Sequence, residues 1–364
     1  MSTEADSRDE GSVSWPRVIA PGKIFLAGEY GVLQGATALV MAINRHVRMS
    51  NEEPASIDGG ISTPVGVRHT EQVDDPLLRV LIEEARSIAT LPGTPFHLDA
   101  QELYSPNGQK LGLGSSAAKA AAVITGAFLL AGEAPDLPST RQRILKVAMG
   151  AHNRSGGGSG ADVAAAVLGG AVEYRLLEKD VGIDGLCSSV RPYLARKADL
   201  PSRSMPLVVH GNSPVSTRDA ISRLDAAREA GNSSIERHLD MTAEAGEQLA
   251  RCLMDPAASD RELLELVDQS SNTLLELTQA LGLGAGSGAS TLDTATSVAR
   301  RLGGAAKPSG AGGGDLVLVF VPAIPLEERR QAASALDRAG LHVLDVAIDE
   351  NGVREERAGL NPIS

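Results

Sequence analysis

Aromatic residues, cysteines and long apolar runs are scarce in this chain, and each shortage excludes a class of protein. Phe, Trp and Tyr make up 2% of the 364 residues, too few rings for stacking the bases of single-stranded nucleic acid. Two cysteines, Cys187 and Cys252, cannot form a disulfide framework or a zinc site, which favours a reducing, cytoplasmic setting. The longest apolar run, residues 120–132, is shorter than the roughly 20 residues that span a bilayer, so it predicts a buried helix.

Basic residues are also in deficit, because 34 Lys and Arg stand against 46 Asp and Glu, for a net charge of -12. Without a basic stripe, nucleic acid and anionic membranes are poor partners, and an anionic ligand needs a local cluster of Lys, Arg and backbone N–H groups. The polar, acidic residues 1–14 lack the basic start and apolar core of a signal peptide, so we expect a disordered tail. The length favours two domains, which we place at 15–200 and 201–364.

What the chain does contain is a succession of strand and helix patterns typical of an α+β protein. The first half predicts two short strands joined by a turn over 17–26, extended segments at 37–42 and 47–50, helices at 76–89, 115–131, 140–153 and 161–168, and a strand at 171–175. A mixed Gly, Pro and charged region, 180–204, separates the halves. The second half predicts a strand at 207–209, helices at 218–230, 234–254, 260–281 and 291–302, and a strand–helix–strand ending at 316–348 that indicates a ferredoxin-like sandwich.

Glycine is abundant, and the most informative glycine-rich loop is 110–119. It places Gly112, Gly114, Ser115 and Ser116 directly ahead of an Ala-rich helical run. Glycine lets backbone N–H groups face a ligand, and the helix N-terminus adds unpaired N–H groups and a partial positive charge. The loop lacks the Gly-Lys-Ser/Thr ending of a Walker loop. It therefore predicts an anion site of the kind that holds a nucleoside triphosphate.

Three further glycine-rich loops each place a charged residue beside glycines. Loop 21–30 contains Lys23, loop 155–162 ends at Asp162 in the first turn of a predicted helix, and loop 307–315 begins at Lys307. Each has a simpler interpretation, since a lysine in a turn is usually solvated and an acid in a first turn is most often a helix cap. Residues 284–289 imitate a dinucleotide fingerprint but follow a helical pattern, so we reject that interpretation. The seven histidines lack metal-ligand spacing.

Three of these loops together carry a family resemblance. The segments PGKIFLAGEY at 21–30, KLGLGSSAA at 110–118 and KPSGAGGGD at 307–315 resemble the three motifs of the GHMP small-molecule kinases, in order, with GSGAD at 158–162 between the second and third. The resemblance covers the chain from about residue 18 to residue 346. It implies a two-domain α+β GHMP kinase fold, with an N-terminal α/β domain that binds ATP, a C-terminal ferredoxin-like sandwich, and an active site in the cleft between them.

Within the family, several details are most similar to phosphomevalonate kinases. They are Tyr30 after Gly-Glu, Val163 and three alanines after Asp162, and Asp315 closing the third motif. The resemblance thus implies ATP-dependent phosphorylation of 5-phosphomevalonate to 5-diphosphomevalonate, with Mg²⁺, by a monomer or homodimer. Mevalonate kinase is the alternative, and a catalytically silent sensor on the same fold is a second one that the retention of Lys23 and Asp162 disfavours.

The resemblance also assigns roles to residues. Lys23 offsets negative charge between acceptor and γ-phosphate, Asp162 accepts or orients the acceptor's proton, and the Ser116 hydroxyl is the metal ligand. Nucleotide binding is assigned to Lys110, Gly112, Leu113, Gly114, Ser115, Ser116 and Ala117. Acceptor binding is assigned to Glu29, Tyr30, Ser159, Gly160, Ser216, Thr217, Lys307, Ser309, Gly310, Gly312 and Asp315.

Overall fold

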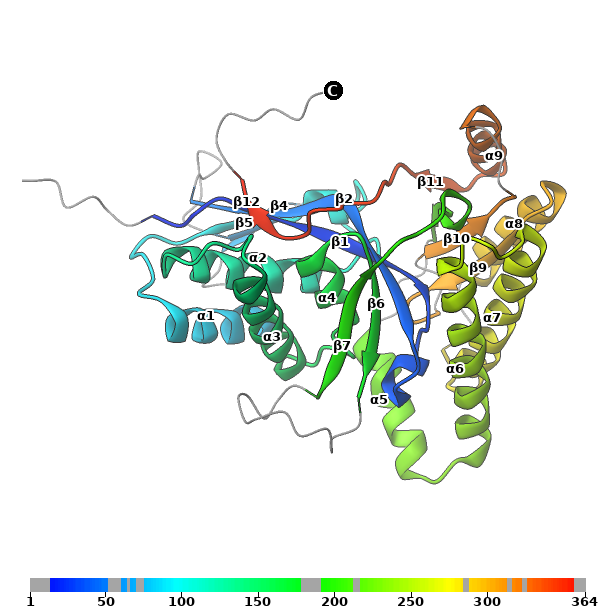
Figure 1. The fold of residues 1–364 in the computed structure, drawn as a ribbon, viewed down its shortest axis with the longest axis horizontal. Helices are drawn as coiled ribbons and strands as arrows, with labels where there is room; N and C mark the ends of the chain where they lie inside the picture. Colours follow the sequence, from blue (N-terminus) through cyan, green and yellow to red (C-terminus); the bar gives the residue numbers. More distant parts are fainter. Residues whose placement is uncertain are drawn as a thin grey trace, which may run out of the picture.

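Two β-sheets organise the chain, a larger one built mainly from the first half and a smaller one from the second half (Figure 1). The computed structural model describes residues 14–51, 60–63, 66–69, 75–177, 191–211, 217–283, 288–312, 316–322 and 326–356. In these ranges the larger sheet has eight strands: β1 (Val18–Ala27), β2 (Ala38–Ser50), β3 (Gly60–Thr63), β4 (Gly66–His69), β5 (His97–Asp99), β6 (Ala171–Leu176), β7 (Tyr193–Ala198) and β12 (Arg354–Glu355). The smaller sheet has four: β8 (Leu207–His210), β9 (Ala305–Ser309), β10 (Leu316–Phe320) and β11 (His342–Leu344).

Four helices cover one face of the larger sheet (Figure 1). They are α1 (Pro76–Ile88), α2 (Ser115–Leu130), α3 (Pro138–Arg154) and α4 (Ala161–Leu168), and the short 3₁₀ turns η1 (Gly31–Gln34), η2 (Gln101–Leu103) and η3 (Ser202–Ser204) join other elements. Helix α2 packs against β1, β2, α1, α3 and α4, and its residues 117–128 are all buried. The buried helix predicted from the apolar run at 120–132 is therefore confirmed for residues 120–128, although the helix ends at residue 130 and residues 131–132 are exposed.

The second half adds the helices α5 (Thr217–Glu229), α6 (Ser233–Met254), α7 (Asp260–Ala280), α8 (Gly288–Arg301) and α9 (Leu326–Arg338). Of these, α7, α8 and α9 pack on strands of the smaller sheet. The sheet order is β11-β8-β10-β9 with every neighbouring pair antiparallel, so β10 and β11 run parallel on either side of β8. That is the split βαβ arrangement, and the predicted ferredoxin-like sandwich is confirmed. Within the described residues, no helix is both long and apolar enough to cross a membrane.

Local signals located the helices well. The predicted helix 161–168 has the bounds of α4, and the predictions at 115–131 and 260–281 are one residue longer than α2 and α7. Side-chain caps explain several starts: Asp75 accepts the Leu77 N–H ahead of α1, and Asn232 accepts the Ser234 N–H ahead of α6.

The strand–turn–strand prediction for residues 17–26 is wrong. Residues 18–27 form one strand, β1, which pairs with β2 on both sides of the Pro-Gly step and with β12 at its start. The register shifts between Pro21 and Gly22, so the proline, which has no N–H to donate, sits at a bulge instead of a turn. Likewise, the extended segments at 37–42 and 47–50 are parts of the single strand β2.

Two other departures concern strands that the sequence patterns hid. Residues 307–309, expected as the start of the loop 307–315, belong to β9, which pairs with β10. Of the predicted final strand at 341–348, only residues 342–344 pair with β8, and the chain then crosses back to the larger sheet. There Ile348 bridges Ile43, and β12 pairs with β1. The strand β12 of the second half therefore joins the sheet that the first half builds.

Candidate active site

The second glycine-rich loop leads into α2 as the sequence predicts. Gly112 and Gly114 have left-handed backbones, with φ of 74° and 80°, and no side chain caps the helix after Gly114. The first N–H groups of α2 are therefore left for another partner, as an anion site requires. Ser115 is buried at the first helical position, whereas Ser116 is partly exposed at the second.

Lys23 of β1 lies directly against this loop. Its backbone N–H donates to the Leu113 carbonyl at 2.8 Å, and its Nζ donates to the Gly112 carbonyl at 3.2 Å. A Cβ at Gly114 would come within 2.7 Å of the Lys23 side chain, and one at Gly22 within 2.6 Å of the Leu113 carbonyl oxygen. Glycine at both positions lets the lysine strand and the loop pack together, so the first two motifs form one unit.

The third loop presents Asp162 at the start of α4. Gly160 precedes the helix with φ of 91°, and every residue of α4 other than Asp162 is buried. The Asp162 carboxylate accepts the Val163 N–H at 3.0 Å, and the Ser159 hydroxyl accepts the Ala161 N–H at 3.3 Å. The acid is therefore carried by a helix that packs on β1, the strand of Lys23. The pairing of Asp162 with Lys23 stays a prediction.

The last glycine-rich loop is fastened to the first motif. Lys307 Nζ forms an ion pair with Glu29 Oε1 at 2.5 Å, and the Lys307 side chain is 0% exposed. The Ser309 hydroxyl donates to the Phe25 carbonyl at 2.8 Å, and the Tyr30 hydroxyl to the Ala311 carbonyl at 2.9 Å. Four residues that the family resemblance assigned to the acceptor thus form contacts between the first and third motifs: Glu29, Tyr30, Lys307 and Ser309.

The remaining predicted residues divide by position. Lys110 is exposed, and its backbone forms an isolated antiparallel β-bridge with Tyr104 just ahead of the glycine-rich loop. Gly310 and Gly312 have left-handed backbones, and Gly312 faces Thr278 of α7. Thr217 begins α5, but its side chain, Ser216 and Asp315 lie outside the described residues, as do Cys187 and the segment 284–287.

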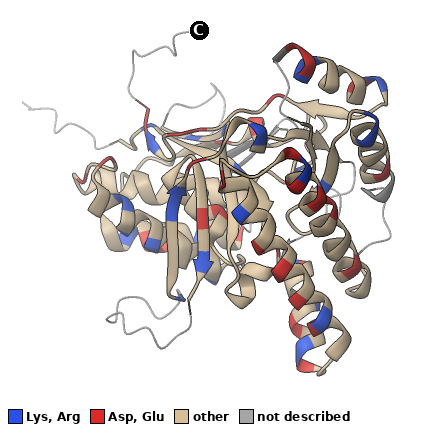
Figure 2. Ribbon diagram, turned by 45° about the vertical axis from the view of Figure 1, so that its right-hand side comes forward, with Lys and Arg blue, Asp and Glu red and all other residues tan. Residues whose placement is uncertain are grey.

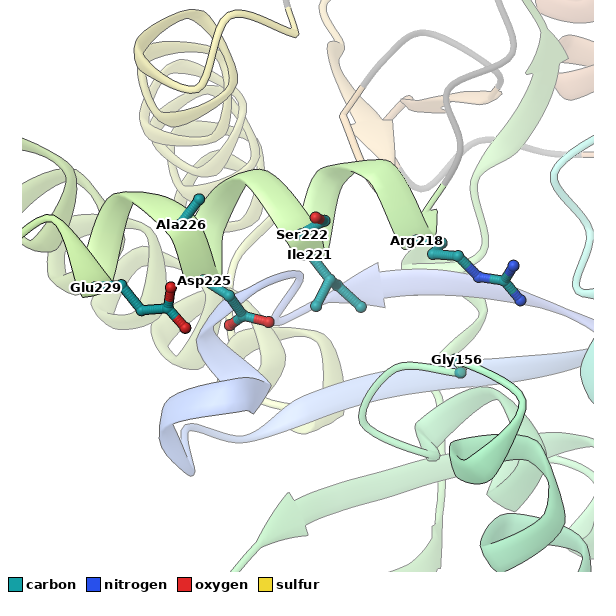
Figure 3. A pocket seen from close by; sticks show the side chains of 8 residues that line it. Gly156, Arg218, Ile221, Ser222, Asp225, Ala226 and Glu229 are labelled. Carbon is teal, nitrogen blue, oxygen red and sulfur yellow. The ribbon is translucent and has the colours of Figure 1, made fainter.

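A pocket of about 380 Å³ opens between the Asp162 loop and α5. One face of α5 lines it, and Figure 3 shows Arg218 beside Gly156 at one end, with Asp225 and Glu229 at the other. Arg218 donates to the Ser155 carbonyl at 2.5 Å, and its guanidinium occupies the space that a Cβ at Gly156 would need. The volume falls in the range of small-molecule sites.

Three further residues near the site were not among those predicted from the sequence. Arg218 directly follows Thr217, and its place after a Ser-Thr pair was the available signal. Tyr174 of β6 is buried and donates to the Ser159 carbonyl at 2.8 Å, supporting the loop ahead of Asp162. His152 lies behind Gly157, where its ring fills the place of a Cβ, so only glycine fits there. Nothing local in the sequence indicated either of the last two contacts.

Burial shapes the electrostatics of the two tyrosines. Desolvation, with Glu29 adding to it, raises the pKa of Tyr30 well above its usual range. Desolvation, with the charges of Tyr193 and Asp162 adding to it, does the same to the pKa of Tyr174. Both hydroxyls therefore stay protonated and act as hydrogen-bond donors at neutral pH. Figure 2 shows acidic and basic positions intermingled along the helices of the second half.

Fold and site together define a class of protein: a small-molecule phosphotransferase in which a glycine-rich helix N-terminus meets a strand lysine. Residues 81–170 match the GHMP kinases N terminal domain, and the chain belongs to the GHMP kinase family.

Its relatives include kinases of two substrates. The chain is 30% identical over 317 residues to a mevalonate kinase of Aeropyrum pernix, covering 83% of this chain and 87% of that relative. It is 26% identical over 345 residues to a phosphomevalonate kinase of Streptomyces sp. strain CL190, covering 84% and 89%. The structure of Streptococcus pneumoniae phosphomevalonate kinase with phosphomevalonate and AMPPNP has the same fold, with a TM-score of 0.67 at 19% identity over 91% of this chain and 99% of that one.

Proposed function

We propose that this protein transfers the γ-phosphoryl group of ATP to 5-phosphomevalonate, producing 5-diphosphomevalonate and ADP. The observation that carries the proposal is the position of Lys23, bonded through both its backbone and its Nζ to the loop at the start of α2. A cation held there lies where a triphosphate on the helix N-terminus would place its terminal phosphate.

The nucleotide is held mainly by the backbone. N–H groups of residues 112–117 receive the phosphates, and Lys110 lies on the rim of the same loop. Ser116 fits a role as Mg²⁺ ligand, because its partly exposed hydroxyl stands at the helix N-terminus and Mg²⁺ is usually held by one or two protein groups together with substrate phosphates. The part of the chain that the structure describes has no cluster of three His, Cys, Asp or Glu side chains suited to a metal. When bound, Mg²⁺ neutralises phosphate charge.

The transfer step joins two anions. An oxygen of the acceptor's phosphate attacks the γ-phosphorus of ATP, a new O–P bond forms, and the bond to the β,γ-bridging oxygen breaks to release ADP. The acceptor phosphate has a second pKa of about 6, so it is largely ionised at neutral pH and a strong base is unnecessary. Lys23 offsets the charge as the groups approach, and Asp162 orients the lysine and the acceptor.

The acceptor site lies between the Asp162 loop, the start of α5 and the third motif. We assign Ser159 and Gly160 to one side of this site and Gly310 and Gly312 to the other. The family resemblance adds Ser216, Thr217 and Asp315, whose side chains lie outside the described residues. The pocket beside Gly156 extends this region, and the Arg218 guanidinium is suited to a carboxylate or phosphate.

Mevalonate kinase is the second candidate, because the Aeropyrum pernix enzyme of that name is 30% identical to this chain. In that case Asp162 would act as the base that deprotonates a primary alcohol. The phosphomevalonate assignment is supported by the Streptomyces relative, which aligns over more of the chain, and by the residues at 30, 163 and 315 that resemble its subfamily.

A coupled assay of ADP release, run with 5-phosphomevalonate and mevalonate side by side, tests the proposal. We expect turnover of 5-phosphomevalonate, and a Lys23→Met variant about 100-fold slower with nearly unchanged AMPPNP affinity, because the lysine acts mainly in the transition state. Turnover of mevalonate alone would establish the second candidate instead. AMPPNP binding without turnover of either acceptor would favour a sensor.

A further inference from the structure

Alternate residues of the third motif reach back to the first motif and form a seam. Lys307 contacts Glu29, Ser309 contacts the Phe25 carbonyl, and the Ala311 carbonyl accepts from Tyr30. These partners lie about 280 residues apart in sequence. We call these three contacts the motif seam.

The central contact is sealed from solvent. The Lys307 side chain is 0% exposed and that of Glu29 is 4% exposed, and Lys307 Nζ also donates to the Pro308 carbonyl at 2.7 Å. A lysine in this position can reach an acceptor only by leaving its carboxylate unpaired in the interior, which is strongly unfavourable. Direct contact with a substrate is therefore not the role that this arrangement supports.

The turn that bears Glu29 is itself held rigidly. Tyr30 has φ of 56°, the one positive value at a residue other than glycine in the described ranges, and its ring is buried against α5, α6 and α7. Gly28 packs on Gly246 of α6 so closely that a Cβ at Gly246 would lie 2.9 Å from the Gly28 Cα atom. A residue keeps such a backbone only where its surroundings determine it.

The seam connects two parts of the proposed active site. Phe25 is two residues from Lys23 on β1, and Ser309 ends β9 directly before the glycine turn at 310–312. We propose that the buried Glu29–Lys307 ion pair is a positioning device that holds this glycine turn at a fixed place relative to Lys23. The inference rests on the proposed function in assigning the acceptor to that turn. A buried ion pair suits the task because its geometry is directional, whereas apolar side chains of similar size would add stability without fixing orientation.

The test compares Glu29→Leu, Lys307→Met and the double variant with the wild type. Each single variant leaves one buried polar group without its partner, so its Tm falls, and the double variant regains much of that loss. We expect the double variant to keep its AMPPNP affinity while kcat stays about 100-fold low, since a displacement of about 1 Å near the reacting groups has an effect of that size.

A milder pair of variants guards against misfolding. Ser309→Ala removes the hydroxyl bond to the Phe25 carbonyl, and the matched control Ser204→Ala removes a buried hydroxyl bond of 2.7 Å to the Leu253 carbonyl. We expect Ser309→Ala to lower kcat about tenfold, the loss expected from one buried hydrogen bond that aligns reacting groups, and the control to leave kcat unchanged.

Three outcomes would overturn the inference. The first is a folded double variant with wild-type kcat, and the second is an equal loss of kcat in Ser309→Ala and Ser204→Ala. The third is a rise in the acceptor KM of the double variant or of Ser309→Ala with kcat unchanged, which would indicate direct contact with the acceptor. If the wild type turns over neither acceptor, the proposed function fails, and hydrogen exchange still decides about the seam. Faster exchange of the amides at 305–312 in the double variant supports a positioning role, and unchanged exchange contradicts it.

Discussion

At the scale of single residues, the site depends on where side chains are missing. Gly114 leaves room for the Lys23 side chain at the start of α2. Gly156, in the loop ahead of α4, leaves room for the guanidinium of Arg218. In both places a positive φ and a close neighbour coincide, so two independent reasons exclude a larger residue.

Variants of the two glycines that flank α2 can distinguish the effect of a positive φ from the effect of a close neighbour. Gly114 has φ of 80° and a Cβ there would lie 2.7 Å from Lys23, whereas Gly132 has φ of 77° and nothing within 4 Å. We expect Gly114→Ala to lower kcat/KM about 100-fold by displacing Lys23, with a stability loss of about 1 kcal/mol from backbone strain. Gly132→Ala shares only the stability loss.

Steady-state kinetics and thermal unfolding of both variants check this. Equal kinetic losses at the two positions would mean that backbone strain alone, and not contact with Lys23, explains the effect. Unchanged kinetics in Gly114→Ala would remove the lysine from the proposed mechanism.

At the scale of elements, a charged cluster fastens residues 345–355, the segment that follows β11, to β2. His46 Nε2 lies 2.7 Å from Asp349 Oδ2 and its Nδ1 lies 3.4 Å from Glu102, while Arg354 and Arg48 complete the pairs. Burial alone would lower the pKa of His46, but hydrogen bonds to Asp349 and Glu102 outweigh it and raise that pKa. Although burial opposes it, bonds from His46 and a nearby arginine lower the pKa of Asp349 and of Glu102 to about 2.

These shifts predict how stability depends on pH. The raised pKa of His46 contributes stability that is complete below its unfolded value of about 6.5 and is lost as pH rises through the folded value. The lowered pKa values of Asp349 and Glu102 contribute stability above about pH 4 that is lost as pH falls toward 2. The cluster is therefore most effective between about pH 4 and pH 6.5.

Replacing His46 by glutamine tests the upper limit of this pH range. We expect the wild type to exceed His46→Gln in Tm by about 2–4 °C at pH 5.5, the shift that about 1 kcal/mol produces in domains of roughly this size. The difference should shrink on raising the pH to 9, as the histidine loses its proton. A difference that stays constant from pH 5.5 to pH 9 would show that the imidazole packs there without carrying a charge.

At the scale of the whole molecule, the two halves meet along several contacts. Helix α6 packs on β1 and η1, the motif seam joins β1 to β9, and β12 pairs with β1 in the larger sheet. Arg218 adds a contact from α5 to the Ser155 carbonyl across the pocket (Figure 3). The proposed acceptor site is thus built from both halves and exists only when they are joined.

Arg218 and Arg223 form a matched pair on α5 for testing this. Arg223 bonds Asp219 and the carbonyls of Leu281 and Gly282, all within its own half. We expect Arg218→Ala to raise the acceptor KM about tenfold without changing the KM for ATP, since one charge-assisted hydrogen bond contributes about 1.5–3 kcal/mol. Arg223→Ala should leave both KM values near wild type. If Arg218→Ala changes neither KM, the pocket lies outside the acceptor site.

Local signals in the sequence determined most helices, the α+β class and the family. Caps, helical periodicity and glycine-rich loops act over a few residues, so α4 and the start of α2 could be placed without a structure. Pairing with β2 overrode the local turn signal of Pro21 and Gly22, because a strand bonded on both sides of a bulge is more stable than an isolated turn.

Tertiary structure alone decided which charged residues face each other. The sequence placed Glu29 and Lys307 in motifs but held no sign that they would form a buried ion pair across 278 residues. Nor did it show that His46 would meet Asp349, or that Arg218 would reach the Ser155 carbonyl. Such contacts depend on how sheets and helices pack, and packing is set by the whole chain, whereas caps and loops are set by their immediate neighbours.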